Sequence, residues 1–407
     1  MHILYIYQYF GTPLACCGTR SYGLARRWVA KGHKVTILTS TVRLADTYLS
    51  AAKGRFVKRM QIDGIDVLAL NVYYNQQMGV LRRCWSFLAF LLLASVVALF
   101  VPKVDIIYAS STPLTVGVPA LVAKWFKRRK LVFEVRDQWP ESPIEIGIIR
   151  NRFLIKFLIW FEKTIYRQSA AIVAVSSGMA EDIKLLAGEK PVHVIPNCAD
   201  LDMFKPGIDG KAFCEKYGLA GKLVFLHAGS MGIINDLDFV IRAAEKVKDH
   251  NDIVFVTIGK GNHKLFLQER VKKLGLTNVM ILPPMLKQEL PAALAAADVV
   301  MAIIGKYPII ERHASLNKFY EGISCGKPIL LNYSGWQREL IEKADAGLGC
   351  RLCDVDEFVN NVLYISQHRE HLPVMGRNAR SLAEEFFDRG KLADHLENIL
   401  QGMVKKA

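Results

Sequence analysis

The chain has 407 residues, which is too long for one ordinary hydrophobic core, so two domains are expected. Apolar residues make up 51% of it, which excludes a largely disordered protein. Most of the formal net charge of +15 lies in the first half, because residues 1–200 carry 26 Lys and Arg against 13 Asp and Glu. A basic half favours an anionic partner surface, either nucleic acid or an anionic membrane.

Strands and helices alternate in the first half. Residues 2–10 indicate a buried strand rather than a signal peptide, because they lack a basic start and a small-residue cleavage site. A glycine-containing loop and a helix follow, and apolar runs of strand length then recur at 33–40, 104–110, 130–137, 170–176 and 192–197. Strands separated by helices predict a parallel sheet covered on both faces.

The second half restarts the alternation after a linker near residues 197–207, which is marked by Asp and Pro. Its strand-like runs are 222–228, 252–258, 279–285, 297–304, 327–333 and 347–350. We therefore expect two similar α/β domains facing a central cleft, residues 1–200 and 205–384. The C-terminal helix, 385–407, is expected to pack back on the first domain.

Residues 84–102 interrupt this pattern with 19 residues that carry no charge. Three readings remain open: a helix lying in the face of a membrane, a buried crossover helix, or a membrane span. A span is disfavoured, because strands of one sheet flank the segment on both sides. The flanking cations favour the first reading. Residues 151–167 interleave aromatic residues with cations and are a second candidate for an interfacial helix, or an amphipathic helix docked on the sheet.

The eight cysteines do not form a metal-ligand pattern. Cys350 and Cys353 make one C-x-x-C pair, but zinc sites need four ligands and no second pair lies nearby. The adjacent Cys16 and Cys17 and the remaining cysteines are expected to be ordinary reduced thiols. We predict no metal site.

Glycine-rich turns follow several of the predicted strands. Open parallel sheets bind ligands at the carboxyl ends of their strands, and glycine lets backbone amides approach phosphate oxygens. No turn matches G-x-G-x-x-G or the P-loop pattern, which disfavours a nicotinamide enzyme or a P-loop ATPase. Their recurrence at several strand ends favours nucleotide binding.

The stretch from Ser315 to Leu330 carries the strongest local signal. Ser315 is a candidate N-cap, and Asn317 and Lys318 would lie in the first helical turn, where amides and an ammonium group would hold a diphosphate. Glu321, one turn further on, would accept hydrogen bonds from two vicinal ribose hydroxyls. The alternative is an ordinary amphipathic helix with a solvent-facing glutamate.

Six ordered segments, at 7–40, 133–147, 174–183, 193–204, 227–238 and 317–330, resemble retaining glycosyltransferases of family 4. The last of them reads NKFYEGISCGKPIL. The resemblance covers nearly the whole chain and implies the GT-B fold, with two Rossmann-like parallel-sheet α/β domains. It also implies a donor site drawn from Gly18, Arg20, Gly229, Ser230, Gly259, Lys260, Gly261, Pro284, Met285, Leu316, Asn317, Lys318 and Glu321.

The chain departs from the family pattern at two places. The first acid of the family's E-x7-E motif falls on His313, with Glu311 two residues earlier. Many members carry a cation just after the turn at 229–232, where this chain has Ile233; Arg312, Lys318 or Lys260 would have to replace it. The candidate catalytic residues are Asp137, Glu311, His313 and Lys318, and Arg136 and Glu141 have similar claims as neighbours of Asp137.

The resemblance implies retaining transfer of a sugar, expected to be an N-acetylated hexosamine, from a UDP-sugar; GDP-mannose remains an alternative donor. The basic half and the apolar segment suggest a lipid-linked acceptor, such as a polyprenyl diphosphate saccharide, in polysaccharide or O-antigen assembly. We expect no metal cofactor, because no strand-end turn carries a D-x-D-like site. We also expect no nucleic acid partner, and peripheral attachment to the cytoplasmic face of the cell membrane. An epimerase or hydrolase on the same fold is an alternative, and a basic membrane- or RNA-binding module is a more distant one.

Overall fold

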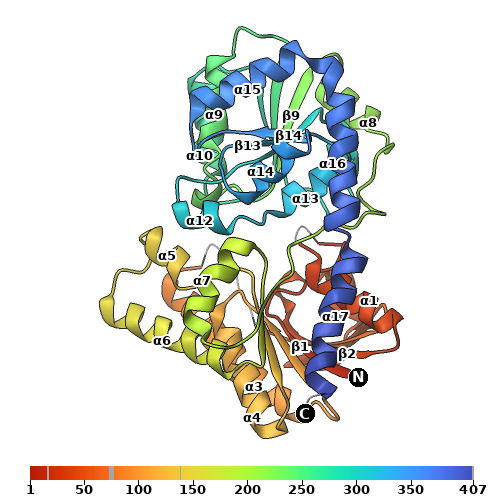
Figure 1. The fold of residues 1–407 in the computed structure, drawn as a ribbon, viewed down its shortest axis with the longest axis vertical. Coiled ribbons are helices and arrows are strands. Elements are labelled where there is room, and N and C mark those ends of the chain that lie inside the picture. The colour runs from red at the N-terminus through yellow and green to blue at the C-terminus, as the bar shows by residue number, and fades with distance from the viewer. Residues whose placement is uncertain (16–17, 73–77, 138, 406–407) are drawn as a thin grey trace. The chain divides into compact units, whose positions relative to one another are not determined.

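The computed structural model describes residues 1–407 apart from 16–17, 73–77, 138 and 406–407. The expectation about Cys16 and Cys17 therefore lies outside the described residues. The chain forms two compact units (Figure 1). The first domain comprises Met1–Pro196 and Arg389–Ala407, and the second comprises Asn197–Asp388. The chain first passes from one domain to the other between Pro196 and Asn197, at the start of the expected linker, so the linker residues belong to the second domain.

The first domain is built on an eight-stranded sheet with the order β3-β4-β2-β1-β5-β6-β7-β8. All neighbouring strands are parallel except β3 and β4, which form an antiparallel hairpin that the sequence analysis did not predict. The strands are β1 (His2–Ile6), β2 (Lys34–Ser40), β3 (Val57–Ile62), β4 (Ile65–Leu70), β5 (Ile106–Ser110), β6 (Leu131–Val135), β7 (Ala171–Ala174) and β8 (Val192–Val194).

Helices cover both faces of this sheet, as continuous apolar strands require. Along β1, Leu4 packs into a core shared with α3, α4, α6 and α7, while Tyr5 packs into a second core with α1 and α17. The helices are α1 (Arg20–Ala30), α2 (Asp46–Ala51), α3 (Val80–Phe100), α4 (Gly117–Lys127), α5 (Glu141–Glu145), α6 (Arg152–Gln168), α7 (Ser177–Ala187) and α17 (Arg389–Lys405), with 3-10 turns η1 (Thr41–Arg43) and η2 (Leu114–Val116). Figure 1 shows the C-terminal helix α17 beside α1.

The second domain has a six-stranded sheet, all parallel, with the order β11-β10-β9-β12-β13-β14. The strands are β9 (Leu223–Ala228), β10 (Ile253–Ile258), β11 (Val279–Leu282), β12 (Val299–Ala302), β13 (Ile329–Leu331) and β14 (Gly347–Gly349). The helices are α8 (Lys211–Tyr217), α9 (Asp238–Lys246), α10 (Lys264–Lys273), α11 (Leu290–Ala295), α12 (Pro308–His313), α13 (Asn317–Ser324), α14 (Trp336–Lys343), α15 (Val355–Gln367) and α16 (Leu372–Phe386), with η3 (Ile233–Asn235) and η4 (Arg369–His371).

Both sheets reverse their strand order at one point, between β1 and β5 in the first domain and between β9 and β12 in the second. Open parallel sheets bind ligands beyond the carboxyl ends of the strands at such a switch point. The residues that follow β1, β5, β9 and β12 are therefore the first places to look for a site. The predicted α/β class, with two Rossmann-like domains, is confirmed.

The apolar segment forms most of helix α3. One side of the helix, with Phe90, Ala94 and Ala98, is fully buried, whereas Trp85 and Phe100 stand on the exposed side. Among the described residues, no helix has the length and apolarity that crossing a membrane would require. The amphipathic segment 151–167 corresponds to helix α6, which Asn151 caps by accepting hydrogen bonds from the amides of Phe153 and Leu154.

Candidate functional site

Helix α13 carries the acid and the cation that the sequence singled out. It begins at Asn317, and its N-cap position is Leu316, which cannot accept a hydrogen bond through its side chain. The prediction that Ser315 caps the helix is therefore wrong. The Ser315 hydroxyl instead pairs with the Tyr320 hydroxyl at 2.8 Å. The first amides of α13 are left without a side-chain cap, which is the arrangement that an anionic ligand can complete.

Glu321 points inward and is only 5% exposed, so the reading of a solvent-facing glutamate does not hold. Its carboxylate forms an ion pair with Lys287, which lies after β11. The Lys287 ammonium also lies 5.1 Å from the centre of the Phe204 ring. A buried carboxylate needs a paired cation, and Lys287 supplies it here.

Lys318 is buried as well, at 8% exposure, and its ammonium donates a hydrogen bond to the side-chain oxygen of Asn235 at 3.0 Å. Burial lowers the pKa of Lys318 to about 8, and the Glu321 charge opposes that shift only in part. A Cβ at Gly229 would lie 3.3 Å from the Lys318 Nζ. The ammonium of Lys318 therefore reaches from α13 to the glycine turn that follows β9.

The turns after β9 and β10 are joined by main-chain hydrogen bonds. The Gly229 amide donates to the Ile258 carbonyl and the Met231 amide donates to the Lys260 carbonyl, both at 2.9 Å. A Cβ at Gly259 would collide with the Gly229 carbonyl oxygen. A Cβ at Gly261 would likewise collide with the Met231 backbone. Gly259 and Gly261 are thus required by the close approach of two backbones, which fixes the shape of the turn beside Lys318.

The other predicted donor residues of the second domain mostly lie at neighbouring strand ends. Ser230, Lys260 and Pro284 are exposed after β9, β10 and β11, which are adjacent in the sheet. The remaining ones are partly buried; they are Gly261 after β10, Met285 after β11, and Leu316 and Asn317 at the start of α13. The structure thus brings the ends of three adjacent strands together as one surface.

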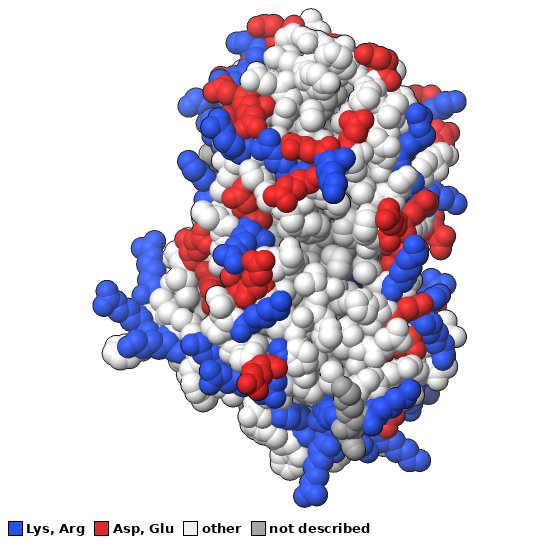
Figure 2. All heavy atoms as spheres, viewed as in Figure 1, with Lys and Arg blue, Asp and Glu red and all other residues white. Residues whose placement is uncertain are grey.

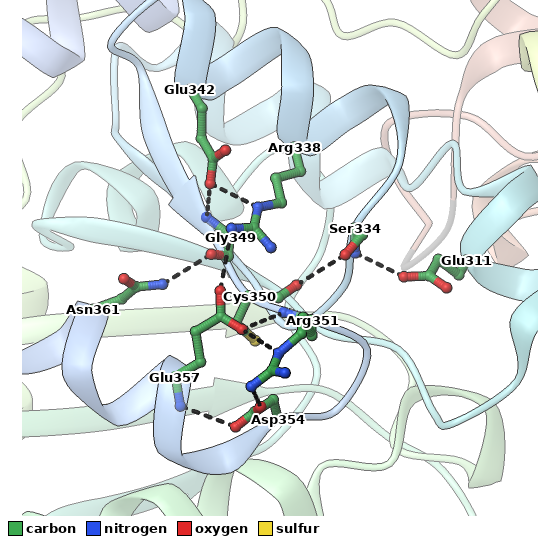
Figure 3. Close-up of polar contacts among 10 residues, drawn as sticks. All are labelled: Glu311, Ser334, Arg338, Glu342, Gly349, Cys350, Arg351, Asp354, Glu357 and Asn361. Atoms are coloured by element: carbon green, nitrogen blue, oxygen red, sulfur yellow. Dashed lines mark hydrogen bonds and ion pairs between the residues drawn. The ribbon is translucent and has the colours of Figure 1, made fainter.

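Glu311, His313 and Arg312 lie on the short helix α12. The Glu311 carboxylate accepts a hydrogen bond of 2.8 Å from the Ser334 amide in the loop after β13 (Figure 3). The Ser334 hydroxyl donates to the Cys350 carbonyl. The main chain around Cys350 also joins a network of hydrogen bonds and ion pairs, whose side chains are those of Arg338, Glu342, Arg351, Asp354, Glu357 and Asn361. Glu311 thus acts as an anchor for a loop. His313 is buried and Arg312 is exposed.

Arg20 has a different environment from the one that the resemblance implies. Its guanidinium forms a buried ion pair with Glu134 at 2.9 Å, and it donates to the carbonyls of Ile195 and Pro196. Burial alone would raise the pKa of Glu134, but Arg20 and then Arg136 outweigh it and hold that pKa below its ordinary value. Arg20 is therefore committed to the interior of the first domain. Gly18 lies just before α1 and is partly exposed.

Asp137 lies at the carboxyl end of β6 and is exposed. The Thr112 hydroxyl, from the end of β5, donates a hydrogen bond of 2.6 Å to its carboxylate. The neighbouring Arg136 donates to the Tyr7 hydroxyl at 2.8 Å and lies over the Tyr7 ring. The ends of β1, β5 and β6 are therefore linked around Asp137, at the switch point of the first sheet.

Three residues of this second-domain arrangement were not predicted: Lys287, Asn235 and His227. His227 is fully buried at the end of β9, where burial and then the Lys318 charge lower its pKa well below its ordinary value, so it is neutral. The apolar strand pattern around His227 does not predict that this residue lies beside Lys318. Lys287 carried no local signal, because its partner Glu321 lies 34 residues away in the chain.

Among the described residues, no group of three or more His, Cys, Asp or Glu side chains is placed to hold a metal ion. Cys350 is buried and Cys353 donates through its thiol to the Ile304 carbonyl. The C-x-x-C pair therefore contributes to packing and hydrogen bonding within the second domain.

The comparisons with known families agree with this geometry. Residues 17–198 match the family model described as "Glycosyl transferase 4-like domain", and residues 212–382 match "Glycosyl transferases group 1". The chain belongs to glycosyltransferase family 4 and has the GT-B fold. It is a glycosyltransferase. No curated protein sequence matches it.

Solved structures show the same fold at low sequence identity. Sucrose-phosphate synthase from Thermosynechococcus elongatus is 14% identical with a TM-score of 0.78, and each chain is covered completely. HepE of Anabaena in complex with UDP-glucose is 18% identical with a TM-score of 0.74, over 99% of this chain and 100% of that one. WaaG, a glycosyltransferase involved in lipopolysaccharide biosynthesis, is 14% identical with a TM-score of 0.69, with the same coverage.

Proposed function

We propose that this glycosyltransferase takes a sugar from a nucleoside diphosphate sugar with retention at the anomeric carbon, and that the second domain binds the donor. One observation carries the proposal: the buried Lys318 ammonium reaches the glycine turn at Gly229 from the uncapped start of α13. A cation, glycine-lined amides and a helix start together suit a diphosphate. Lys318 would then replace the cation that Ile233 fails to supply.

The hard step in such a transfer is departure of the diphosphate, whose charge grows as the sugar bond breaks. Fixed donors aimed at that charge lower the barrier because they need no reorganisation. Lys318 and the first amides of α13 would provide them. Glu321 would accept hydrogen bonds from the two ribose hydroxyls, sharing its carboxylate with Lys287.

We propose that the donor is a UDP-sugar and that the sugar is an N-acetylated hexosamine. GDP-mannose is the alternative donor. HepE of Anabaena, which shares the fold, was solved with UDP-glucose. A thermal-shift series with UDP, GDP, ADP and TDP tests the base. A ligand at a hundred times its Kd stabilises the folded chain by about 2.7 kcal/mol. The shift should be greatest with UDP and should shrink in Glu321→Gln but not in Glu339→Gln, an exposed control on α14. An equal response to all four nucleotides would reject the assignment.

Asp137 is our candidate for the group beside the acceptor hydroxyl or the transferred sugar. Its exposure at the switch point of the first sheet supports this role. Asp137→Asn keeps the shape and the acceptor for the Thr112 hydroxyl but removes the charge. Turnover should fall about 10²- to 10⁴-fold, as for loss of a general acid–base group. Asp202→Asn, at an exposed aspartate of the second domain, is the control; unchanged turnover in Asp137→Asn would remove this residue from the mechanism.

An epimerase or hydrolase on this fold would process the donor without an acceptor. Product analysis with the donor alone separates these activities from transfer. We expect little turnover until an acceptor is added; complete conversion of the donor alone would favour the alternative.

The first domain presents a surface that suits a lipid-linked acceptor. Helix α4 lies between α3 and α6 and contacts both. All three helices expose large apolar side chains, and those of α3 and α6 recur every three or four residues as a stripe. The set is Trp85, Leu88, Leu92, Leu93, Val96 and Phe100 on α3, Trp125 and Phe126 on α4, and Phe153, Leu154, Phe157 and Trp160 on α6.

Cations surround these apolar side chains. The exposed ones are Arg82, Lys103, Arg128, Arg129, Arg150, Arg152, Lys156 and Arg167, and Figure 2 shows blue side chains gathered over the end of the first domain where α5 and α6 lie. Each cation near an anionic leaflet contributes about 1 kcal/mol. We propose that this surface, which we call the helical face, binds the cytoplasmic side of an anionic membrane, where a polyprenyl diphosphate saccharide would be the acceptor in polysaccharide or O-antigen assembly.

Sedimentation with lipid vesicles tests the helical face. The chain should bind vesicles that contain phosphatidylserine or phosphatidylglycerol, and Phe157→Glu should weaken that binding. Leu265→Glu, which changes an even more exposed apolar residue on α10 of the second domain, should leave it unaltered. Equal weakening by the two variants, or no binding at low salt, would remove the membrane proposal while leaving the donor proposal standing.

A further inference from the structure

Two carboxyl groups, on α5 and α6, meet inside the first domain. Glu162 on α6 is fully buried, and its Oε1 accepts a hydrogen bond of 2.7 Å from the Tyr166 hydroxyl. Its Oε2 and the Oε2 of Glu141 on α5 are both buried, and neither receives a hydrogen bond from a conventional donor. The two side chains are close enough for each to act on the pKa of the other as a hydrogen-bonding neighbour.

A hydrogen bond between two carboxyl groups requires a proton, because an ionised carboxylate can only accept. Two ionised carboxylates that are neighbours and have buried oxygens would also repel each other. Burial raises the pKa of Glu141. Burial, and then the neighbouring Glu141, raise the pKa of Glu162 to about 9. One proton shared between the two groups would satisfy both orphaned oxygens at once.

The surrounding charged groups do not stabilise both carboxyl groups in their ionised forms. On α6 itself, Lys163 favours the ionised form of Glu162, but it has a smaller influence than burial and Glu141. From α7, Asp182 adds negative charge and raises the pKa of Glu141 further. Lys124 of α4 is engaged with the side chain of Gln168 at 2.7 Å.

We propose that Glu141 and Glu162 share one proton at neutral pH and that this shared proton holds α5 against α6. Glu141 opens α5 and follows Asp137 by four residues, through Trp139, whose ring packs on the core of the first domain. The pair therefore acts as a positioning device for the turn that carries Asp137. It also ties that turn to α6, which presents part of the helical face. The catalytic consequence rests on the proposed function, but the shared proton does not.

The pH dependence of stability tests the proton directly, and needs no activity. In the unfolded chain Glu162 ionises near its ordinary pKa of 4.5, whereas in the folded chain it stays protonated up to about 9. Between these values the unfolded state binds fewer protons, so stability falls as the pH rises. Glu162→Gln is neutral and still donates a hydrogen bond to Glu141, so it loses this slope.

The experiment compares unfolding midpoints of the wild type, Glu162→Gln, Glu141→Gln and the exposed control Glu189→Gln from pH 5 to pH 9. The unfolding equilibrium constant of the wild type, relative to Glu162→Gln, should grow by up to tenfold for each pH unit. Relative to Glu141→Gln, which leaves Glu162 buried, it should grow over a narrower pH range. The control should follow the wild type. A pH-independent difference between wild type and Glu162→Gln would overturn the proposal. If Glu162→Gln does not fold, the infrared band of a protonated carboxyl must be present in the wild type at neutral pH and must titrate at lower pH in Glu141→Gln, because Glu162 then keeps its burial but loses its charged neighbour; a band that titrates at the same pH in both would overturn the proposal.

Kinetics test the positioning role. Glu162→Ala leaves Glu141 without a partner, and the turn with Asp137 should shift; displacement of a reacting group by about 1 Å costs on the order of a hundredfold in rate. We expect kcat to fall tenfold or more with the donor KM unchanged, and Glu162→Gln to restore most of it at pH 7. Equal kcat in Glu162→Ala and wild type would show that the pair only stabilises the fold. A chain without transferase activity would instead defeat the proposed function and leave the stability series to decide the proton.

Discussion

Arg20 and Lys318 are buried cations at the beginnings of helices in the two domains, and their neighbours differ. Arg20 faces the carboxylate of Glu134 and two main-chain carbonyls. Lys318 donates its hydrogen bond to the neutral amide of Asn235, while the nearby Glu321 is engaged by Lys287.

We interpret this difference as that between a structural cation and a cation available to the donor. A guanidinium with a paired carboxylate and satisfied donors is already compensated, so an anion would gain little there. The ammonium of Lys318 is desolvated without such a partner, and its pKa falls to about 8 as a result. An anionic group beside Gly229 would compensate it, and the four predictions that follow test this contrast.

The largest expected effect is on stability, from Arg20→Met. This variant leaves the Glu134 carboxylate buried without its ion-pair partner, which typically costs about 3 to 5 kcal/mol. Chemical denaturation measures the loss, and Arg26→Met, at an exposed arginine of the same helix, is the control. Normal stability combined with lost donor binding would reverse the roles that we give to the two cations.

Lys318→Met should show the opposite pattern. Its stability should stay close to that of the wild type, because no ion pair is broken, while transfer should slow by about 10²- to 10³-fold, as when one donor to a developing oxyanion is removed. Initial rates at saturating donor measure this. Lys260→Met and Arg312→Met, the two other candidates for the missing cation, should have weaker effects, and Lys272→Met on α10 should have none. A larger loss in Lys260→Met would move the cation to the turn after β10.

Donor affinity should depend on pH through the same residue. Below pH 8 Lys318 is charged in the free protein, so affinity should be constant; above pH 8 the ammonium must first gain a proton, so Kd should rise up to tenfold per pH unit. Titration calorimetry with UDP from pH 7 to 9.5 measures the change. Lys318→Arg, which stays charged throughout, should flatten the profile. If the affinity of Lys318→Arg for UDP falls with pH as steeply as that of the wild type, another group causes the pH dependence.

The smallest expected effect is that of a chelator. If Lys318 and main-chain amides compensate the departing diphosphate, EDTA should leave the transfer rate unaltered. Initial rates with and without EDTA decide this, and a loss that Mg²⁺ or Mn²⁺ restores would contradict a metal-independent mechanism.

Much of the fold followed from local pattern. The apolar runs and intervening helices predicted the parallel sheets, since continuous strands covered on both faces leave that signature. The β3–β4 hairpin was missed although Asp63 and Gly64, both at positive φ, form a two-residue turn typical of hairpins, because its strands mix polar and apolar residues. The cap at Ser315 was assigned wrongly because its hydroxyl is taken by Tyr320, a contact that short-range pattern does not reveal.

The candidate site divides in the same way. The sequence alone identified the turn at Gly229, the helix that begins near Asn317 and the acid Glu321, because backbone freedom and helix starts are local properties. Our choice of Lys318 among the three possible cations rests on the tertiary structure, since it depends on which side chain reaches Gly229. It also showed that Arg20 forms an ion pair with Glu134, 114 residues away. Long-range charge pairing is set by how strands are ordered in the sheet, and strand order is not written in any single stretch of sequence.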